Sequence, residues 1–371
     1  MNKVLVVGGG GYVGCVLVEA LLEKGYNVKV IDRLFFGRDP IEPVADRIEL
    51  IVDDMRDIDE SQMQDCGAVI NIGGLSNDPT AEFNPKANME LNTVASIRLA
   101  ELAKKAGVPR YIFASSCSVY DRGLGEESRD HLLDEDSDVE PRGAYAVAKL
   151  EAERGLLPLA DADFAPVAFR KGTIYGFSPR MRYDLVLNAF VKDALSKGFL
   201  SLHYGGEMWR PLIDVNDVVR GYIMALECEA DLIRGQVFNL SAGNLRISEL
   251  ALRTKRTLAD LGVEVELNVD YSYRLLRTYR VSTDKIMKTL GFQPKVSVEE
   301  SIERMVTEIQ KRGYTDFSHP RYYNIDWMKV LEESVDIVRD HGFVLSKPEW
   351  KDASPSTNGR SAQKTETAAT P

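Results

Sequence analysis

Short apolar runs and segments of helical periodicity alternate along the first half of the chain. Residues 3–7 form an apolar run that predicts a buried strand. Residues 12–24 repeat apolar side chains every three or four positions, which predicts a helix, and Gly25 is placed to end it. Residues 27–32 form a second apolar run, so the chain opens with a strand–helix–strand unit.

The same alternation continues to about residue 176. Further strands are expected at residues 47–54, 67–74, 110–116 and 164–176, and further helices at residues 96–107 and 144–157. Apolar strands separated by helices indicate a parallel sheet that is covered on both faces. The expected fold is therefore α/β, with a Rossmann-type doubly wound parallel sheet in residues 1–176.

After residue 176 the pattern loosens. Helical periodicity returns at residues 185–198, 247–262 and 297–313, and a short strand is expected at residues 235–241. We expect residues 177–345 to form mainly a smaller C-terminal substrate-binding lobe, with strands from about residues 211–240 completing the main sheet. Residues 346–371 are polar and low in complexity, which predicts a disordered tail.

The composition disfavours several classes of partner. The 371 residues carry a formal net charge of −11, so nucleic acid is not an expected partner, because phosphate binding favours a basic face. No run approaches the ~20 apolar residues of a membrane span, and no signal peptide is expected before the first strand.

The four cysteines are scattered without a metal-ligand spacing, which predicts a reduced, cytoplasmic protein with no structural metal.

Four consecutive glycines, Gly8 to Gly11, stand between the first strand and the first helix. Gly8, Gly11 and Gly14 meet a GxxGxxG pattern. Phosphate oxygens approach such a turn because no Cβ blocks them and because the helix N-terminus offers unpaired N–H groups. Asp32 ends the second strand, where a carboxylate accepts hydrogen bonds from an adenosine ribose and repels a 2′-phosphate. The pattern therefore predicts a dinucleotide cofactor, NAD rather than NADP.

Several motifs follow one another in the order of one family. The GxxGxxG turn, the pair Tyr145-x-x-x-Lys149 and the segment SSCSVYD at residues 115–121 together resemble the extended short-chain dehydrogenase/reductase family, in its nucleotide-sugar epimerase/dehydratase branch. The resemblance extends to about Trp327. It implies a cofactor site made of Gly8, Gly11, Tyr12, Val13, Gly14, Asp32, Arg33, Asp54, Met55, Gly73, Gly74, Asn92, Tyr145 and Lys149.

Tyr145 and Lys149 are candidates for the chemistry. They are four residues apart, so a helix places them on one face. A tyrosine has a pKa near 10, and a neighbouring lysine cation favours the phenolate, which makes Tyr145 a candidate base. The resemblance adds Ser116, at the end of the fifth strand, as the residue that hydrogen-bonds the reacting hydroxyl. Ser116, Tyr145 and Lys149 are therefore the expected catalytic unit.

The two positions after Ser116 bear on the type of reaction. Sugar 4,6-dehydratases of the family carry Asp-Glu there, and its UDP-glucuronate decarboxylases keep the Glu, whereas this chain has Cys117 and Ser118. The resemblance therefore disfavours dehydration and decarboxylation, which lose their expected general acid/base. Two interpretations of Cys117 stay open: an acid/base of its own, or a small buried side chain under the nicotinamide.

Arginines of the second half suit a substrate diphosphate, because the guanidinium fork matches phosphate oxygens. The resemblance aligns Arg210 and Pro211 with an element whose arginine grips that diphosphate, although Asp214 stands where the element usually has His. Arg180, Arg182, Arg277 and Arg280 are equally well explained as solvated arginines. The expected substrate-binding residues are Ser76, Asn77, Ser116, Cys117, Ser118, Arg182, Asn188, Arg210 and Arg277.

Taken with the resemblance, these residues predict an NAD-dependent enzyme that acts on a nucleotide sugar. The expected reaction is epimerisation, most simply at C4 of an NDP-hexose, by transient oxidation to a ketosugar and return of the hydride. The alternatives are an NAD(P)H-dependent NDP-4-ketosugar reductase, a sugar dehydratase and a non-catalytic NAD-binding regulator. A homodimer is also expected.

Overall fold

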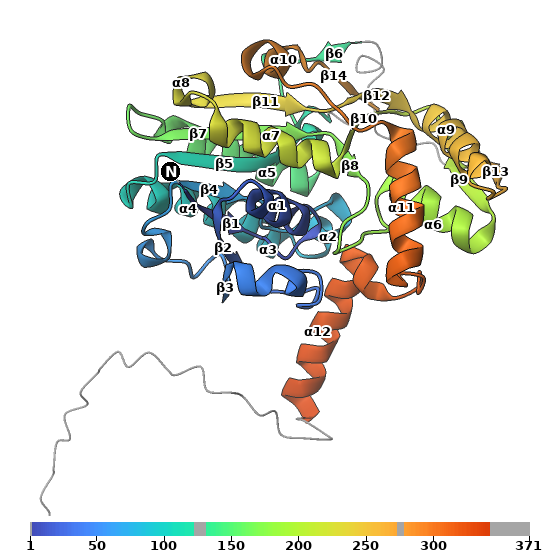
Figure 1. Ribbon diagram of the computed structural model, residues 1–371, viewed down its shortest axis with the longest axis horizontal. Helices are drawn as coiled ribbons and strands as arrows, with labels where there is room; N and C mark the ends of the chain where they lie inside the picture. Colours follow the sequence, from blue (N-terminus) through green and yellow to red (C-terminus); the bar gives the residue numbers. More distant parts are fainter. Residues whose placement is uncertain (1, 122–130, 273–277, 342–371) are drawn as a thin grey trace, which may run out of the picture. The chain divides into compact units, whose positions relative to one another are not determined.

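In the computed structural model, the apolar runs of the first half lie side by side in a parallel sheet (Figure 1). The structure describes residues 2–121, 131–272 and 278–341, and within them the sheet has seven strands in the order β11-β7-β5-β4-β1-β2-β3. These strands are β1 (Lys3–Val7), β2 (Asn27–Asp32), β3 (Glu49–Val52), β4 (Ala68–Asn71), β5 (Arg110–Ser116), β7 (Ala165–Lys171) and β11 (Gln236–Leu240). The expected α/β fold is confirmed. The order reverses between β1 and β4, and a doubly wound sheet binds ligands beyond the carboxyl ends of its strands at such a point.

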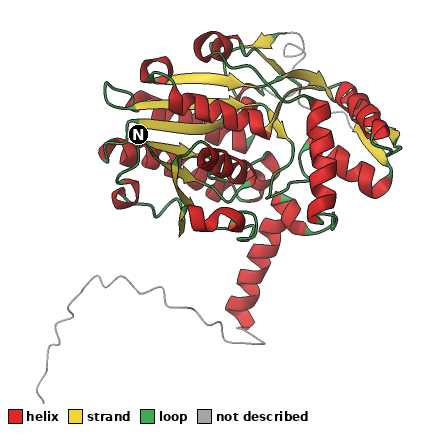
Figure 2. Cartoon of the chain, in the orientation of Figure 1, coloured by secondary structure: helices red, strands yellow, loops and turns green. Residues whose placement is uncertain are grey.

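Helices cover both faces of this sheet (Figure 2). On one face, α1 (Tyr12–Glu23) and α7 (Val215–Glu227) pack on alternate side chains of the strands, such as Val4 and Val6. On the other face, α4 (Ala95–Lys105) and α5 (Ala144–Leu156) pack on Leu5, among others. Short α-helices also lie between these elements, namely α2 (Asp78–Phe83), α3 (Pro85–Met89), α8 (Ala230–Ile233) and α10 (Asp284–Leu290).

The single strand expected at residues 164–176 is two strands. β7 ends at Lys171, and β8 (Thr173–Tyr175) pairs with β10 (Trp209–Asp214) instead of joining the main sheet. The chain crosses Pro211 so closely at Gly172 that a Cβ there would lie 2.9 Å from the Pro211 carbonyl oxygen. The continuous apolar run hid this division, because the crossing is a contact with a segment 39 residues away in the sequence.

The main sheet is completed by one of the strands expected within residues 211–240. β11 pairs with β7 at the edge of the sheet. β10 pairs instead with β8 and β12 (Gly243–Arg246) in a separate three-stranded sheet. The expectation was wrong for β10, because its partner β8 has already left the main sheet.

The second half contains the three long helices that the periodicity predicts. α6 (Val186–Lys197), α9 (Ile247–Asp260) and α11 (Val298–Arg312) share one apolar cluster. Two short parallel ladders accompany them. β9 (Phe199–His203) pairs with β13 (Glu266–Asp270), and β6 (Leu132–Leu133) pairs with β14 (Arg280–Val281).

The chain divides into two units, Met1–Met328 and Lys329–Pro371. α12 (Asn324–His341) begins in the first unit, and the described part of the second unit is helical. The tail expected at residues 346–371 and the candidate Arg277 lie outside the described residues. Among the helices that the structure describes, none combines the length and the apolar composition needed to cross a membrane.

Candidate active site

The glycine turn between β1 and α1 leaves no room for a Cβ at Gly8 or Gly14. Gly8 has a φ of +89°, and a Cβ on it would lie 2.7 Å from the Gly73 nitrogen, on the segment that follows β4. A Cβ on Gly14 would lie 2.3 Å from the Gly8 carbonyl oxygen. Gly11 caps α1 without a side-chain hydrogen bond, so the first N–H groups of the helix keep their capacity to bind an anion.

Asp32 closes this turn from the end of β2. Its carboxylate accepts hydrogen bonds from the backbone N–H groups of Gly10, at 2.9 Å, and Leu34, at 2.7 Å. Burial raises the pKa of Asp32, and these two bonds oppose the rise. Each carboxylate oxygen can accept a further bond, so Asp32 has the capacity to bind ribose hydroxyls.

Asp54 lies beside the same turn at the end of β3. Arg33 and Arg56 each place a guanidinium nitrogen within 2.8 Å of its carboxylate. The hydrogen bond from Arg56 is the main reason that the pKa of Asp54 falls to about 2. The carboxylate is therefore ionised at neutral pH.

A cavity opens on the carboxyl ends of β1, β2 and β3. A second cavity opens toward the second half of the chain. The two share Gly8, Gly11, Gly74, Ser76 and Asn324 in their walls, so they form one continuous cleft. The first cavity also has Asp32, Arg33, Asp54, Met55 and Gly73 in its wall, and the second has Tyr12, Val13, Gly14, Asn77, Ser116, Ser118, Tyr145, Arg182 and Arg210.

Tyr145 faces the second cavity from the first turn of α5. Burial raises the pKa of its phenol to about 12, and the carboxylate of Asp78 adds to the rise. The Arg182 cation and a hydrogen bond with the Ser116 side chain oppose it. Two side-chain hydrogen bonds hold the start of α5 in place, from Asn88 to the Ala144 carbonyl at 2.9 Å and from Thr93 to the Ala148 carbonyl at 2.8 Å.

Lys149 lies one turn further along α5 and is almost fully buried. Its ammonium nitrogen is 4.8 Å from the centre of the Phe113 ring and 5.8 Å from the centre of the Tyr145 ring. Burial sets the pKa of Lys149 well below its ordinary value. Since no hydrogen bond joins this ammonium to any described residue, it retains its donors for a ligand hydroxyl.

Cys117 does not line the cleft. Its thiol is fully buried and donates to the Arg170 carbonyl oxygen at 3.0 Å. Burial raises the pKa of the thiol, so Cys117 stays protonated and is unsuited to acid/base work at neutral pH. Of the two interpretations, the structure supports the buried side chain. Ser118 does face the cavity, and its hydroxyl donates to the Ser116 oxygen at 2.9 Å.

Two expected asparagines lie behind the cleft rather than in its wall. Asn92 donates to the Leu75 carbonyl oxygen at 2.9 Å, and its own oxygen would lie 2.2 Å from a Cβ on Gly74. Asn188 accepts from the Gly176 N–H at 2.9 Å and donates to the Arg182 carbonyl at 2.9 Å. Both side chains are fully buried and position loops that carry wall residues.

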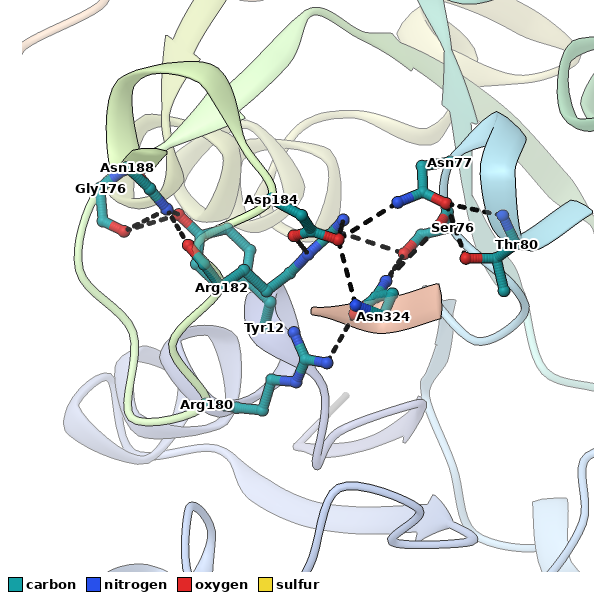
Figure 3. A network of polar contacts seen from close by, with 10 residues as sticks. All are labelled: Tyr12, Ser76, Asn77, Thr80, Gly176, Arg180, Arg182, Asp184, Asn188 and Asn324. Carbon is teal, nitrogen blue, oxygen red and sulfur yellow. Dashed lines mark hydrogen bonds and ion pairs between the residues drawn. The ribbon is translucent and has the colours of Figure 1, made fainter. Parts of the chain in front are cut away.

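Figure 3 shows a residue that no sequence motif indicated, Asn324 at the start of α12. Its side-chain oxygen accepts from Arg180 at 2.6 Å, and its amide donates to the Ser76 hydroxyl at 2.7 Å. Its backbone N–H donates to Asp184 at 3.2 Å, and Asp184 binds Arg182 through both of its oxygens at 2.8 and 3.0 Å. One asparagine thus connects segments that lie up to 248 residues apart.

The expected arginines have different surroundings. Arg180 is buried, with its guanidinium carbon 3.5 Å from the centre of the Phe36 ring, so it is not a solvated residue. Arg210 faces the second cavity from β10, and it donates to the Trp209 carbonyl oxygen at 2.8 Å.

Lys171 and Asp78 also line this cavity, and sequence reasoning missed both because neither belongs to a motif.

Similarity to known proteins covers most of the chain. Residues 4–241 match the model of the NAD dependent epimerase/dehydratase family. UDP-glucuronic acid decarboxylase 4 of Arabidopsis thaliana is 27% identical over 320 residues, which cover 85% of this chain and 70% of that protein. A putative UDP-glucose 4-epimerase of Methanocaldococcus jannaschii is 26% identical over 322 residues, which cover 84% of this chain and 100% of that one. The solved structure of MoeE5 in complex with UDP-glucuronic acid and NAD has a TM-score of 0.70 at 26% identity, covering 84% of this chain and 100% of the other.

Proposed function

The chain belongs to the NAD-dependent epimerase/dehydratase family, and we propose that it is a nucleotide-sugar epimerase, most simply at C4 of an NDP-hexose. Its similar proteins include enzymes named for UDP-glucose 4-epimerisation and UDP-glucuronic acid decarboxylation. The substrate class of this proposal, a sugar carried on a nucleoside diphosphate, follows from those relatives and from the cations in the second cavity.

NAD is the cofactor, and the first cavity fits it. A Cβ on Gly8 or Gly14 would fill the cradle where the backbone meets a pyrophosphate. Asp32 has the acceptors for ribose hydroxyls, and Arg33, Asp54 and Met55 line the adenosine end in our proposal. When bound, NAD supplies the chemistry of accepting a hydride from a sugar carbon and returning it.

The residues of the second cavity supply proton transfer and orientation. In the proposed reaction, Ser116 holds the sugar hydroxyl by a hydrogen bond and Tyr145 removes its proton. The side-chain nitrogen of Lys149 lies 5.8 Å from the centre of the Tyr145 ring, and in its protonated form it would favour the phenolate. When the ketosugar is reduced again on its opposite face, Tyr145 would return the proton to the same oxygen.

The two positions after Ser116 are the observation that favours epimerisation. Ser116 and Tyr145 meet in the cavity, but the position after Ser116 holds a buried thiol that stays protonated, and the next one holds Ser118. A carboxylate at these positions would serve elimination or decarboxylation. Because such a carboxylate is absent, the best supported reaction is transient oxidation of one sugar carbon followed by return of the hydride to the same carbon.

A dehydratase is the second candidate, and Asp78 is the observation that favours it. Asp78 lines the second cavity and lies close enough to raise the pKa of Tyr145. A carboxylate near the base can protonate a leaving hydroxyl. The two candidates therefore differ in whether Asp78 takes part in the reaction.

The test is to incubate the purified full chain with a panel of NDP-hexoses and to identify the products by NMR. Epimerisation yields a stereoisomer of the same mass and needs no added NADH. Loss of water from the product would support the dehydratase, and consumption of NADH in proportion to product would support the ketosugar reductase. A homodimer and a cytoplasmic location stay predictions.

A further inference from the structure

The second cavity contains a lysine that the proposed epimerisation does not use. Lys171 ends β7, and the pairing of β5 with β7 places it opposite Ser116. Neighbouring strands of a sheet lie about 4.8 Å apart, and both residues line the cavity. Since Ser116 holds the reacting hydroxyl in our proposal, Lys171 lies at the sugar end of the substrate.

Lys171 and its neighbour Arg170 belong to opposite faces of the strand. Arg170 is turned into the core, where it pairs with Glu153 at 2.7 Å and donates to the Tyr120 hydroxyl at 2.9 Å. The Arg170 guanidinium is therefore paired within the protein. No hydrogen bond or ion pair joins the Lys171 ammonium to any residue in the described part of the chain.

The other cations near the sugar end have carboxylates beside them. Arg182 binds Asp184 through both carboxylate oxygens, and the charge of Glu153 acts on Lys149. The groups that act on Lys171 are the Arg182 cation and the Cys117 thiol. Burial raises the pKa of that thiol, so it carries no negative charge at neutral pH.

Lys171 is nevertheless charged at neutral pH. Burial is the main reason that its pKa falls to about 8, and the Arg182 cation lowers it further. Its ammonium also lowers the pKa of Lys149, so the two cations repel each other. Burying a charge without a counter-ion destabilises a protein, and an anion in the cavity would remove that cost.

Asp78 does not supply this anion. Of the described residues that line the second cavity, it is the one carboxylate, and it acts on the Tyr145 phenol. It is not among the groups that shift the pKa of Lys171. Asp78 thus acts on the Tyr145 phenol, whereas Arg182 and Cys117 act on Lys171.

We propose that Lys171 selects nucleotide sugars whose ring carries a carboxylate, as in a hexuronic acid, over their neutral hexose counterparts. This inference rests on the proposed function in one respect, namely that a nucleotide sugar occupies the cavity with its reacting hydroxyl at Ser116. The carboxylate pairs with the Lys171 ammonium and supplies the counter-ion that none of the described residues provides. Lys171 is a specificity residue that contacts the substrate and takes no proton in the reaction.

The experiment measures binding and turnover separately. Binding of UDP-glucuronic acid and UDP-glucose to the NAD-loaded full chain is measured by calorimetry, and kcat/KM for both is measured by NMR. We expect wild-type protein to prefer the uronic acid. Lys171→Met removes the charge at nearly the same length and should weaken uronic acid binding by about 10- to 100-fold, with little effect on the hexose. Lys171→Arg should keep most of the preference.

A matched control is Lys285→Met. Lys285 is another half-buried lysine, 5.2 Å from the centre of the Phe238 ring, and it lines neither cavity. This variant should keep the wild-type preference. Equal losses for both sugars in Lys171→Met, or a wild-type preference for the neutral hexose, would overturn the inference. A selective effect on binding without any epimerised product would instead overturn the proposed function and leave the role of Lys171 standing.

Discussion

The two ends of the cleft are built on different principles. At the first cavity, the proposed cofactor end, Gly8, Gly14 and Asp32 come from one strand–helix–strand unit, and Gly8 also packs on Gly73 after β4. At the second cavity, the proposed sugar end, the side chains of the wall come from segments that are far apart, such as Ser116, Arg182 and Arg210. The cofactor end should therefore tolerate few changes of backbone, whereas the sugar end should respond to single side chains and be open to changes in specificity.

The largest effect that separates the two ends is expected from Tyr145→Phe. The ring still packs and only the oxygen is lost, so turnover should fall by about 10²- to 10⁴-fold while NAD binding stays close to that of the wild type. Steady-state kinetics and NAD titration check the two halves of this expectation.

Tyr183→Phe is the control for loss of a hydroxyl. The Tyr183 hydroxyl donates to the Tyr314 carbonyl at 2.7 Å and lines neither cavity. The Tyr183→Phe variant should lose about 1 kcal/mol of folding stability and keep the wild-type turnover. Full activity in Tyr145→Phe would contradict the proposed mechanism.

Arg210→Ala should weaken binding of the nucleotide sugar by about 2–4 kcal/mol and leave NAD binding nearly unchanged. The reason is that the guanidinium faces the second cavity and is absent from the wall of the first. Calorimetric titration with each ligand measures both. Arg246→Ala is the neighbouring control, because Arg246 pairs with Glu207 at 2.9 Å outside the cleft. Equal losses of both ligands in Arg210→Ala would indicate a folding defect.

A smaller effect is expected at the cofactor end from Asp32→Ser. The variant loses acceptors for the ribose and for the Gly10 and Leu34 N–H groups, so NAD affinity should fall about tenfold. Removal of the negative charge should bring the affinity for NADP closer to the affinity for NAD. Fluorescence titration with both dinucleotides measures the ratio, and wild-type protein that already favours NADP would refute the assignment of Asp32.

The smallest effect, and the one that joins the two ends, is expected from Asn324→Ala. Asn324 lies in the wall of both cavities but acts on ligands mainly through Arg180 and Ser76, so each ligand should lose about 1 kcal/mol or less of affinity. The loss should be similar for NAD and for the nucleotide sugar, in contrast to Arg210→Ala. An effect on only one ligand would show that the two ends are independent at this position.

Features that depend on local contacts were predictable from the sequence, whereas features that depend on contacts between distant segments were not. The helical spacing of Tyr145 and Lys149 follows from four residues of chain, and the structure places both on α5. The strand at residues 164–176 was expected whole because its apolar run is continuous, yet Gly172 crosses Pro211 and divides it. Cys117 shares a motif with Ser116 and Ser118, but its side chain turns into the core.

The sequence by itself determined the parallel α/β fold, the glycine turn and the choice of a dinucleotide cofactor. These depend on apolar periodicity and on close backbone approach, which are encoded within short stretches. Only the tertiary structure decided that Asn324 joins Arg180, Ser76 and Asp184, and that Lys171 faces the second cavity without an ion pair to any residue in the described part of the chain. Burial and pairing of a charge depend on what other segments bring to it, and no local pattern contains that information.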